Sequence, residues 1–173
     1  MKTHLLAAVL SVALLAGCTA ARAPLPTVAA VDLDRYAGRW YEIARLPNRF
    51  QAQCVSDTRA TYAQDKDRIT VLNECRLADG RFDSARGVAH AVAGSGNARL
   101  RVSFFRPFYG DYWILALGPD YRWVLVGEPG RRYAWVLART PRLEAAALDA
   151  LLARAAELGF DRSAFVVTPH TQP

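Results

Sequence analysis

The sequence predicts an all-β protein in which eight antiparallel strands form a barrel or a sandwich and one helix follows them. Three observations carry this prediction. Short segments alternate polar and apolar residues, they recur at nearly regular spacing, and tight turns rich in glycine, proline and aspartate separate them. After the eighth segment, residues 140–158 instead place their apolar residues at helical spacing.

Length and composition limit the class of protein. A chain of 173 residues suits one domain, and 52% hydrophobic residues are typical of a globular chain. The net charge is +6, but acidic and basic residues are interspersed and no basic run exceeds two residues. A nucleic-acid-binding surface needs clustered basic residues, so this class is disfavoured, whereas weak attraction to anionic lipid headgroups stays open.

The first 18 residues have the pattern of a secretion signal, with Lys2 before an apolar run too short to span a bilayer. They end in Leu-Ala-Gly-Cys at residues 15–18, which resembles the bacterial lipoprotein box. That resemblance implies that Cys18 is lipidated and becomes the mature N-terminus, and Thr19 after it implies the outer membrane. The alternative is an ordinary secretion signal with an incidental cysteine. Residues 19–30, rich in alanine and proline, are predicted to be a tether before a domain over 31–173.

The first strand is predicted at residues 38–45, and residues 55–63 and 69–75 are predicted to form a hairpin around Asp65 and Lys66. In this register Cys54 and Cys75 lie nearly opposite each other, and their parity turns both sulfurs inward. We therefore expect a Cys54–Cys75 disulfide in an oxidising compartment. A register slip of one residue would instead leave two free buried thiols.

Five further strands are predicted at residues 81–93, 98–105, 111–117, 121–126 and 131–139. The helix that follows has Thr140 as its expected cap, Pro141 at its first position and Gly159 at its end. A short ninth strand is predicted at 165–168. A helix that comes after the strands is expected to pack on their outer side.

The run from Trp40 to Phe50 resembles the bacterial outer-membrane lipocalins, as do residues 102–110, 125–127 and 135–141. The resemblance covers about residues 31 to 170. It implies an eight-stranded antiparallel up-and-down β-barrel with one C-terminal α-helix packed outside.

Three signature positions of that family are present in this chain. The first is a Gly-x-Trp, and the third is an arginine after the eighth strand that lies across this tryptophan. The second, normally Thr-Asp-Tyr, departs at its first residue, which is Pro119. The residues at these positions are Gly38, Trp40, Asp120, Tyr121 and Arg139. The resemblance makes them structural and implies a cation–π contact of about 0.5–2 kcal/mol between the arginine and the tryptophan.

An eight-stranded barrel is just wide enough to hold one small ligand. A row of small residues on one face of strand 81–93, together with Ala60, leaves space, and neighbouring apolar residues would form walls that suit an acyl chain. Glu42 and Arg131 are further candidates for holding a ligand head group, together with two tyrosines of the lining. For each aromatic residue the alternative is plain core packing. The predicted lining consists of Trp135, Tyr133, Tyr109, Tyr112, Ala60, Ala89, Val102, Phe104 and Ile114.

The resemblance implies an anchored, periplasm-facing lipoprotein of the outer membrane that stores or transports fatty acids, such as palmitate, or lysophospholipids, without a cofactor. Dimerisation is known among relatives, so a homodimer is open. The alternatives are an enzyme built on the same barrel and a structural lipoprotein with a filled barrel. After Cys18 the only histidines are His90 and His170, no metal-ligand cluster is recognisable, and no Gly-x-Ser-x-Gly occurs, all of which disfavour the enzyme.

Overall fold

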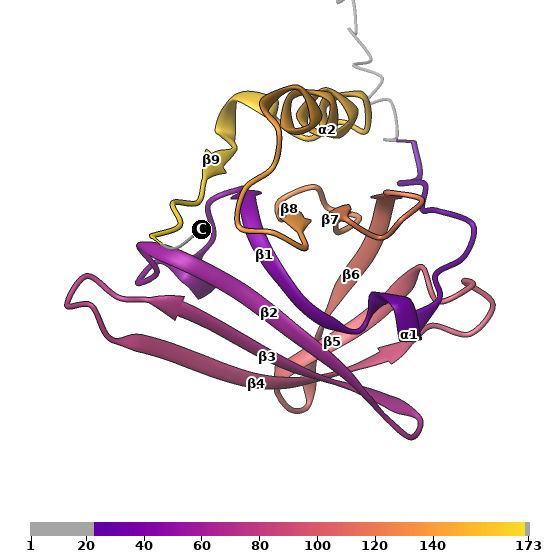
Figure 1. Ribbon diagram of the computed structural model, residues 1–173. Helices are drawn as coiled ribbons and strands as arrows, with labels where there is room; N and C mark the ends of the chain where they lie inside the picture. Colours follow the sequence, from indigo (N-terminus) through magenta and orange to yellow (C-terminus); the bar gives the residue numbers. More distant parts are fainter. Residues whose placement is uncertain (1–22, 172–173) are drawn as a thin grey trace, which may run out of the picture.

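The structure is a computed structural model that describes residues 23–171, so Cys18 and the predicted signal lie outside the described residues. Its centre is a closed antiparallel barrel (Figure 1) in which each strand pairs with the next and β8 pairs with β1. A barrel, and not a sandwich, is therefore confirmed. The strands are β1 Gly38–Arg45, β2 Ser56–Asp65, β3 Arg68–Arg76, β4 Phe82–Ala91, β5 Arg99–Phe105, β6 Phe108–Leu117, β7 Trp123–Gly127 and β8 Ala134–Ala138.

Every second connection emerges at the same end of the barrel, because neighbouring strands run antiparallel. We call one set the mouth loops: residues 46–55, 77–81, 106–107 and 128–133. The opposite end is the floor, where the sequence did not predict the short helix α1, Leu33–Tyr36. The Asp32 side chain caps α1 by accepting hydrogen bonds from the backbone N–H groups of the second and third residues after it.

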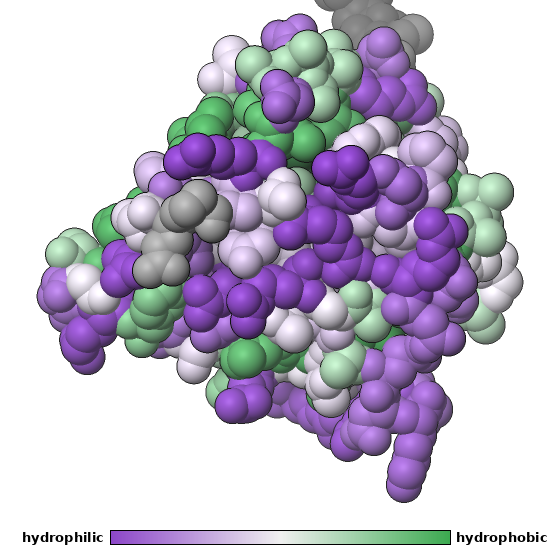
Figure 2. Space-filling view, in the orientation of Figure 1, coloured by the Kyte–Doolittle hydropathy of each residue, from purple (hydrophilic) through white to green (hydrophobic). Residues whose placement is uncertain are grey.

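Two apolar clusters lie on the two sides of the barrel wall. One fills the lower part of the interior, and the other lies between the outer wall and helix α2, Ala145–Glu157. Leu151 and Ala155 of α2 are buried in this outer cluster, so the expected position of the helix outside the barrel is confirmed. Figure 2 shows hydrophilic residues over β2 to β4 and apolar residues gathered beside α2. Within residues 23–171, no helix is long and apolar enough to cross a membrane.

Helix α2 begins later than the sequence predicts. Its first residue is Ala145, and Glu144 before it makes no capping hydrogen bond with its side chain. The predicted cap, Thr140, is wrong because its hydroxyl donates to the Arg142 carbonyl 2.7 Å away, in a local turn before the helix. A side chain engaged in such a turn is not available to cap a helix.

The Cys54–Cys75 disulfide is confirmed, with Cα atoms 5.5 Å apart. The hairpin turn is at Lys66 and Asp67, one residue later than predicted. A bulge at the start of β2, where Asp57 has φ 55°, shifts the register by one residue, and Cys54 lies just before this strand. The disulfide thus joins the chain just before β2 to the end of β3.

The C-terminal segment closes a gap in the wall. β1 pairs with β2 only up to Tyr41, and its last residues pair with β9, Val166–Val167, which follows the short 3-10 helix Arg162–Ala164. Beyond β9, the Thr168 N–H donates to the Ile43 carbonyl and the Asp57 N–H donates to the Pro169 carbonyl. Residues 166–169 therefore lie between the end of β1 and the start of β2.

The predicted tether is partly wrong. Leu25 is only 3% exposed and belongs to the outer apolar cluster, and the Val28 N–H donates to the Ile114 carbonyl of β6 at 3.0 Å. Burial of a leucine and a backbone hydrogen bond to the wall fix this segment. From residue 23 onward, the chain belongs to the folded domain.

Candidate functional site

The floor of the barrel is closed by the signature residues. Trp40 is fully buried, its indole N–H donates to the Tyr36 carbonyl at 2.8 Å, and the Arg139 guanidinium lies 3.9 Å from its ring centroid. Arg139 also donates to the carbonyls of Arg39 and Tyr121. The expected contact between the arginine and the tryptophan is thus present, and both residues are engaged in structure.

The remaining signature residues fix the loop from β6 to β7 beneath the barrel. The Tyr121 hydroxyl accepts from the Asp32 N–H at 2.9 Å, and the Arg35 guanidinium lies 4.1 Å from the Tyr121 ring centroid. Asp120 accepts from the Arg122 N–H within its own turn. Together these contacts join the loop to α1 at the floor.

Above the floor, the buried Tyr36 and Tyr62 and the partly buried Tyr112 form a chain of hydroxyl groups. The Tyr112 hydroxyl lies 2.8 Å from that of Tyr36 and 3.0 Å from that of Tyr62. Burial raises the pKa of all three phenols, that of Tyr62 to about 12, so they are neutral at ordinary pH. Three hydroxyl protons serve two hydrogen bonds, so one donor remains for an acceptor in the interior.

The small residues on β4 provide less space than the sequence suggests. Ala89 is fully buried, as is Ile114 on β6. A Cβ atom on Gly87 would lie 2.8 Å from the Ser103 carbonyl oxygen and 2.9 Å from the Phe104 ring. Phe104 therefore occupies the space beside Gly87, on the mouth side of Ala89.

Within the described part of the chain, four buried side-chain polar atoms have no hydrogen-bond partner. One is the Nε of Arg45, which is paired across the strands with Trp135 near the mouth, and another is the Ser103 hydroxyl. The other two lie deeper on the interior face. They are the Thr58 hydroxyl on β2 and the Asn73 amide oxygen on β3. By strand alternation they share a face with Ala60 and Val71, which lie in the interior cluster. Because buried polar atoms normally have partners, these two need a ligand or solvent to satisfy them.

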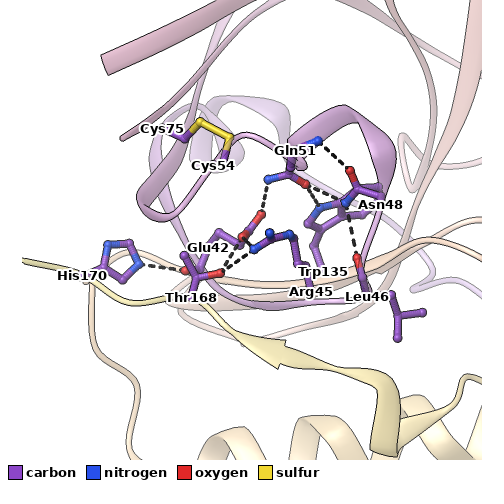
Figure 3. A network of polar contacts seen from close by, with 10 residues as sticks. All are labelled: Glu42, Arg45, Leu46, Asn48, Gln51, Cys54, Cys75, Trp135, Thr168 and His170. Carbon is purple, nitrogen blue, oxygen red and sulfur yellow. Dashed lines mark hydrogen bonds and ion pairs between the residues drawn. A yellow bond between two sulfur atoms is a disulfide. The ribbon is translucent and has the colours of Figure 1, made fainter. Parts of the chain in front are cut away.

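Nearer the mouth, the Glu42 carboxylate is buried and fully engaged (Figure 3). One of its oxygens accepts from Arg45 at 3.0 Å and from the Thr168 hydroxyl at 2.5 Å, and the other accepts from the Gln51 amide at 2.6 Å. Glu42 thus ties β1 to the C-terminal segment and to the first mouth loop. Its bonds are satisfied by the protein, which removes it from the candidates for holding a ligand head group.

Gln51 latches the first mouth loop to the barrel wall. It lies in the 3-10 helix Arg49–Gln51, and its amide oxygen accepts from the Trp135 indole N–H on β8 and from the Asn48 amide, both at 2.9 Å. With its bond to Glu42, this side chain bridges β1 and β8 (Figure 3). The loop is thereby held over the half-buried Trp135, at the entrance to the interior.

Two expected ligand contacts lie elsewhere. Tyr109 is on the outer side of β6, with its ring centroid 6.2 Å from that of His90, because it has the opposite parity to Tyr112. Arg131 donates to the carbonyls of Leu158 and Ala23, outside the barrel. In contrast, Tyr133 stacks on Trp135 with centroids 6.3 Å apart. The interior set is therefore Trp135, Tyr133, Tyr112, Val102 and Phe104, with Ala60, Ala89 and Ile114 below them.

Several residues of this site were not predicted from the sequence. Tyr36 comes from a helix that the sequence did not predict. For Tyr62, the inward parity along its strand was the only signal. Gln51 lies in an irregular loop, where alternation gives no orientation. Within residues 23–171, no group of three or more metal-ligating side chains comes together.

Comparisons with known proteins agree with this architecture. A family model described as a lipocalin-like domain matches residues 31–170. Temperature-induced lipocalin-1 of Arabidopsis thaliana is 40% identical over 156 residues, which cover 85% of this chain and 83% of that protein. Outer membrane lipoprotein Blc of Escherichia coli (strain K12) is 37% identical over 166 residues, which cover 94% and 93%.

Solved structures show the same fold at low sequence identity. Insecticyanin from the tobacco hornworm Manduca sexta has a TM-score of 0.69 at 22% identity, covering 84% of both chains. Lobster apocrustacyanin A1 has a TM-score of 0.67 at 17% identity, covering 86% of this chain and 92% of its own. At such identities the likeness concerns the fold alone.

Proposed function

Because this chain belongs to the lipocalin family, we propose that it is an anchored lipid-binding protein that stores or transports fatty acids or lysophospholipids in the bacterial envelope. The observation that carries this proposal is the composition of the barrel interior. Half-buried apolar side chains surround buried hydroxyl and amide groups that still have hydrogen-bonding capacity. Ligand sites typically combine mostly apolar walls with a few fixed polar groups.

The ligand is proposed to lie along the inner wall between the latch and the tyrosines. Its acyl chain would contact Val102, Phe104 and Trp135, and its head group would remain near Tyr133 at the mouth. The Thr58 hydroxyl and the spare tyrosine proton would serve an oxygen atom or a water molecule that enters with the ligand. Binding without turnover is proposed, since the interior set contains no arrangement of nucleophile and base.

The anchor belongs to the same proposal. Residues 1–18 would be the signal that ends at the lipidated Cys18. The relatives named outer membrane lipoprotein support an outer-membrane position, with the barrel facing the periplasm. Intact mass of the purified protein tests the anchor, because a chain that keeps residues 1–17 and carries no acyl group would refute it.

Native mass spectrometry of the purified protein, followed by displacement of a fluorescent fatty acid, tests lipid binding. Trp135→Arg should remove a co-purified lipid and weaken probe binding, because it places a charge on the interior wall. The matched control is Tyr109→Arg, which makes a similar change on the outer wall and should leave binding intact. Equal loss in both variants, or no acyl binding by the native protein, would overturn the proposal. Turnover of a bound lipid would instead favour an enzyme.

A further inference from the structure

The exposed phenylalanines of this protein gather at one end of the barrel. The residues are Phe50, Phe82, Phe104, Phe105 and Phe108, all in the mouth loops or within two positions of them. The side chains of Phe105 and Phe108 are the most exposed, at 76% and 70%. In the described floor loops, the large apolar residue with the most exposed side chain is Val92, which is 37% exposed. The apolar exposure is thus strongly asymmetric between the two ends.

The two most exposed rings form a projecting pair. Phe105 ends β5, Phe108 begins β6, and their rings stack with centroids 6.4 Å apart and planes within 6°. Phe50 lies on the far side of the mouth, since β1 is on the opposite side of the closed sheet from β5 and β6. Large exposed apolar groups on a folded protein usually mark a surface that meets a partner.

The charge of the mouth points to an anionic partner. The mouth loops contain two acidic residues, and both are engaged: Asp79 pairs with Arg81, and Glu128 accepts from backbone N–H groups of its own loop. Arginine beside exposed aromatic rings suits the interface of an anionic bilayer, where rings enter the acyl boundary and guanidinium groups meet phosphates. Of the five arginines of these loops, Arg81 pairs with Asp79 and Arg131 donates to backbone carbonyls. The other three are Arg49, Arg106 and Arg132.

The start of the described chain lies beside the last mouth loop. The carbonyl of Ala23 accepts from Arg131 of the last mouth loop at 2.8 Å, and the chain begins there beside α2 (Figure 1). Cys18 precedes Ala23 by five residues, which reach at most about 18 Å when fully extended. As part of the proposed function, an acyl anchor on Cys18 would keep the barrel within reach of the membrane on the side of this loop.

We propose that the mouth of the barrel docks on an anionic phospholipid bilayer through Phe105, Phe108 and Phe50, with Arg49, Arg106 and Arg132 contacting lipid phosphates. In this orientation the interior opens directly onto the lipid. An acyl chain then passes between bilayer and barrel without crossing bulk water.

The test places an environment-sensitive fluorophore on an introduced cysteine of the full-length lipidated protein. Phe108→Cys reports on the mouth and Val92→Cys is the matched control at the floor; the native Cys54 and Cys75 are bonded to each other. The vesicles contain phosphatidylcholine and phosphatidylglycerol with brominated acyl chains. We expect strong quenching of the label at position 108 and little at position 92, and weaker quenching at 108 without phosphatidylglycerol.

A second variant connects docking to lipid exchange. The double change Phe105→Ser and Phe108→Ser should slow transfer of a fluorescent fatty acid from vesicles to the protein about tenfold, because two large apolar contacts with the bilayer are lost. Its affinity for the same probe in vesicle-free buffer should not change. Both positions are exposed, so the fold is expected to tolerate these changes.

Three results would overturn the docking proposal. They are equal quenching at positions 108 and 92, transfer at the native rate by the double variant, and concentration-dependent shielding of the label without vesicles, which would indicate a second copy of the chain as the partner. Failure of the proposed function is separately visible. In that case the protein would not bind the fatty-acid probe in vesicle-free buffer, whatever the label at position 108 shows.

Discussion

The guanidinium of Arg139 and the indole of Trp40 share one acceptor, the Tyr36 carbonyl. The indole N–H donates to this oxygen at 2.8 Å and the guanidinium donates to it at 3.2 Å, while its carbon lies 3.9 Å from the ring centroid. One arginine therefore fixes the tryptophan ring and the end of α1 together. This side chain thus joins three parts of the floor of the barrel: the signature tryptophan, α1 and the end of β8.

The change Arg139→Met tests this role. It keeps an apolar stem but removes the cation and its donors, so we expect a loss of about 1–2 kcal/mol in the free energy of unfolding. Denaturant titration measures it. Arg122→Met is the control, because the Arg122 side chain is 72% exposed and should cost little. Equal stability of the two variants would contradict the role assigned to Arg139.

The disulfide should be a major source of stability. Replacing Cys54 and Cys75 with serine opens a covalent loop, and for a sequence separation of 21 residues the expected loss is about 3 kcal/mol. Thermal unfolding with and without reductant measures this. The reductant should lower the melting temperature of the native protein and leave that of the double variant unchanged.

Removing the latch should speed ligand exchange. Gln51→Ala leaves the Trp135 indole N–H and one Glu42 oxygen without their partner, so the first mouth loop should open more readily. We expect dissociation of a fluorescent fatty acid to become about tenfold faster, which corresponds to about 1.4 kcal/mol. Stopped-flow displacement measures the rate, and Gln53→Ala in the same loop is the control. An unchanged rate would show that this loop does not gate the site.

Acid should weaken the seam between β2 and the C-terminal segment. Although burial acts to raise it, hydrogen bonds from Arg76 and Thr171 hold the pKa of Asp57 well below its ordinary value of 3.8. A depressed carboxyl pKa stabilises the fold above the ordinary value, and this contribution is lost as the pH falls below 3.8. Asp57→Asn should therefore be less stable than the native protein near neutral pH, and the difference should shrink in acid.

Asparagine is a suitable replacement at position 57 because it tolerates the positive φ of 55° found there. Unfolding free energies of both proteins, measured from neutral pH down to about pH 2, give the comparison. Asp65→Asn, which removes a half-exposed carboxylate paired with Arg68, is the control. A stability difference that stays constant with pH would mean that the Asp57 charge is not responsible.

The three buried phenols should be sensitive to removal of the central one. Tyr112→Phe leaves the hydroxyl groups of Tyr36 and Tyr62 buried without the partner they share, and each costs about 1–3 kcal/mol. Denaturant unfolding checks this, with Tyr109→Phe on the outer wall as the control. If the two variants are equally stable, solvent already satisfies these hydroxyl groups.

The strands could be predicted from the sequence because alternation is local: β1 spans the predicted residues 38–45, and the other strands differ by a few residues at their ends. The start of α2 could not be predicted, because Thr140 and Pro141 suit the start of a helix as well as the turn that they form. Local pattern also does not reveal that Leu25 packs on the outer wall, because that contact is with distant residues.

The candidate site was only partly predictable. Trp135 and Val102 face the interior as alternation requires, and Tyr109 does not because its parity is opposite to that of Tyr112. The Gln51 latch depends on a loop conformation that brings together residues far apart in the chain. Such contacts follow from the tertiary fold and not from local spacing.

The position of the C-terminal segment sets an order for assembly. β1 needs β8 along one side and residues 166–168 along part of the other, so one of the earliest strands must wait for the latest-made part of the chain. Contacts between such distant residues form slowly, because the intervening chain must first be brought together. During folding, the wall therefore stays open along the seam beside β1 until residues 166–168 have joined it.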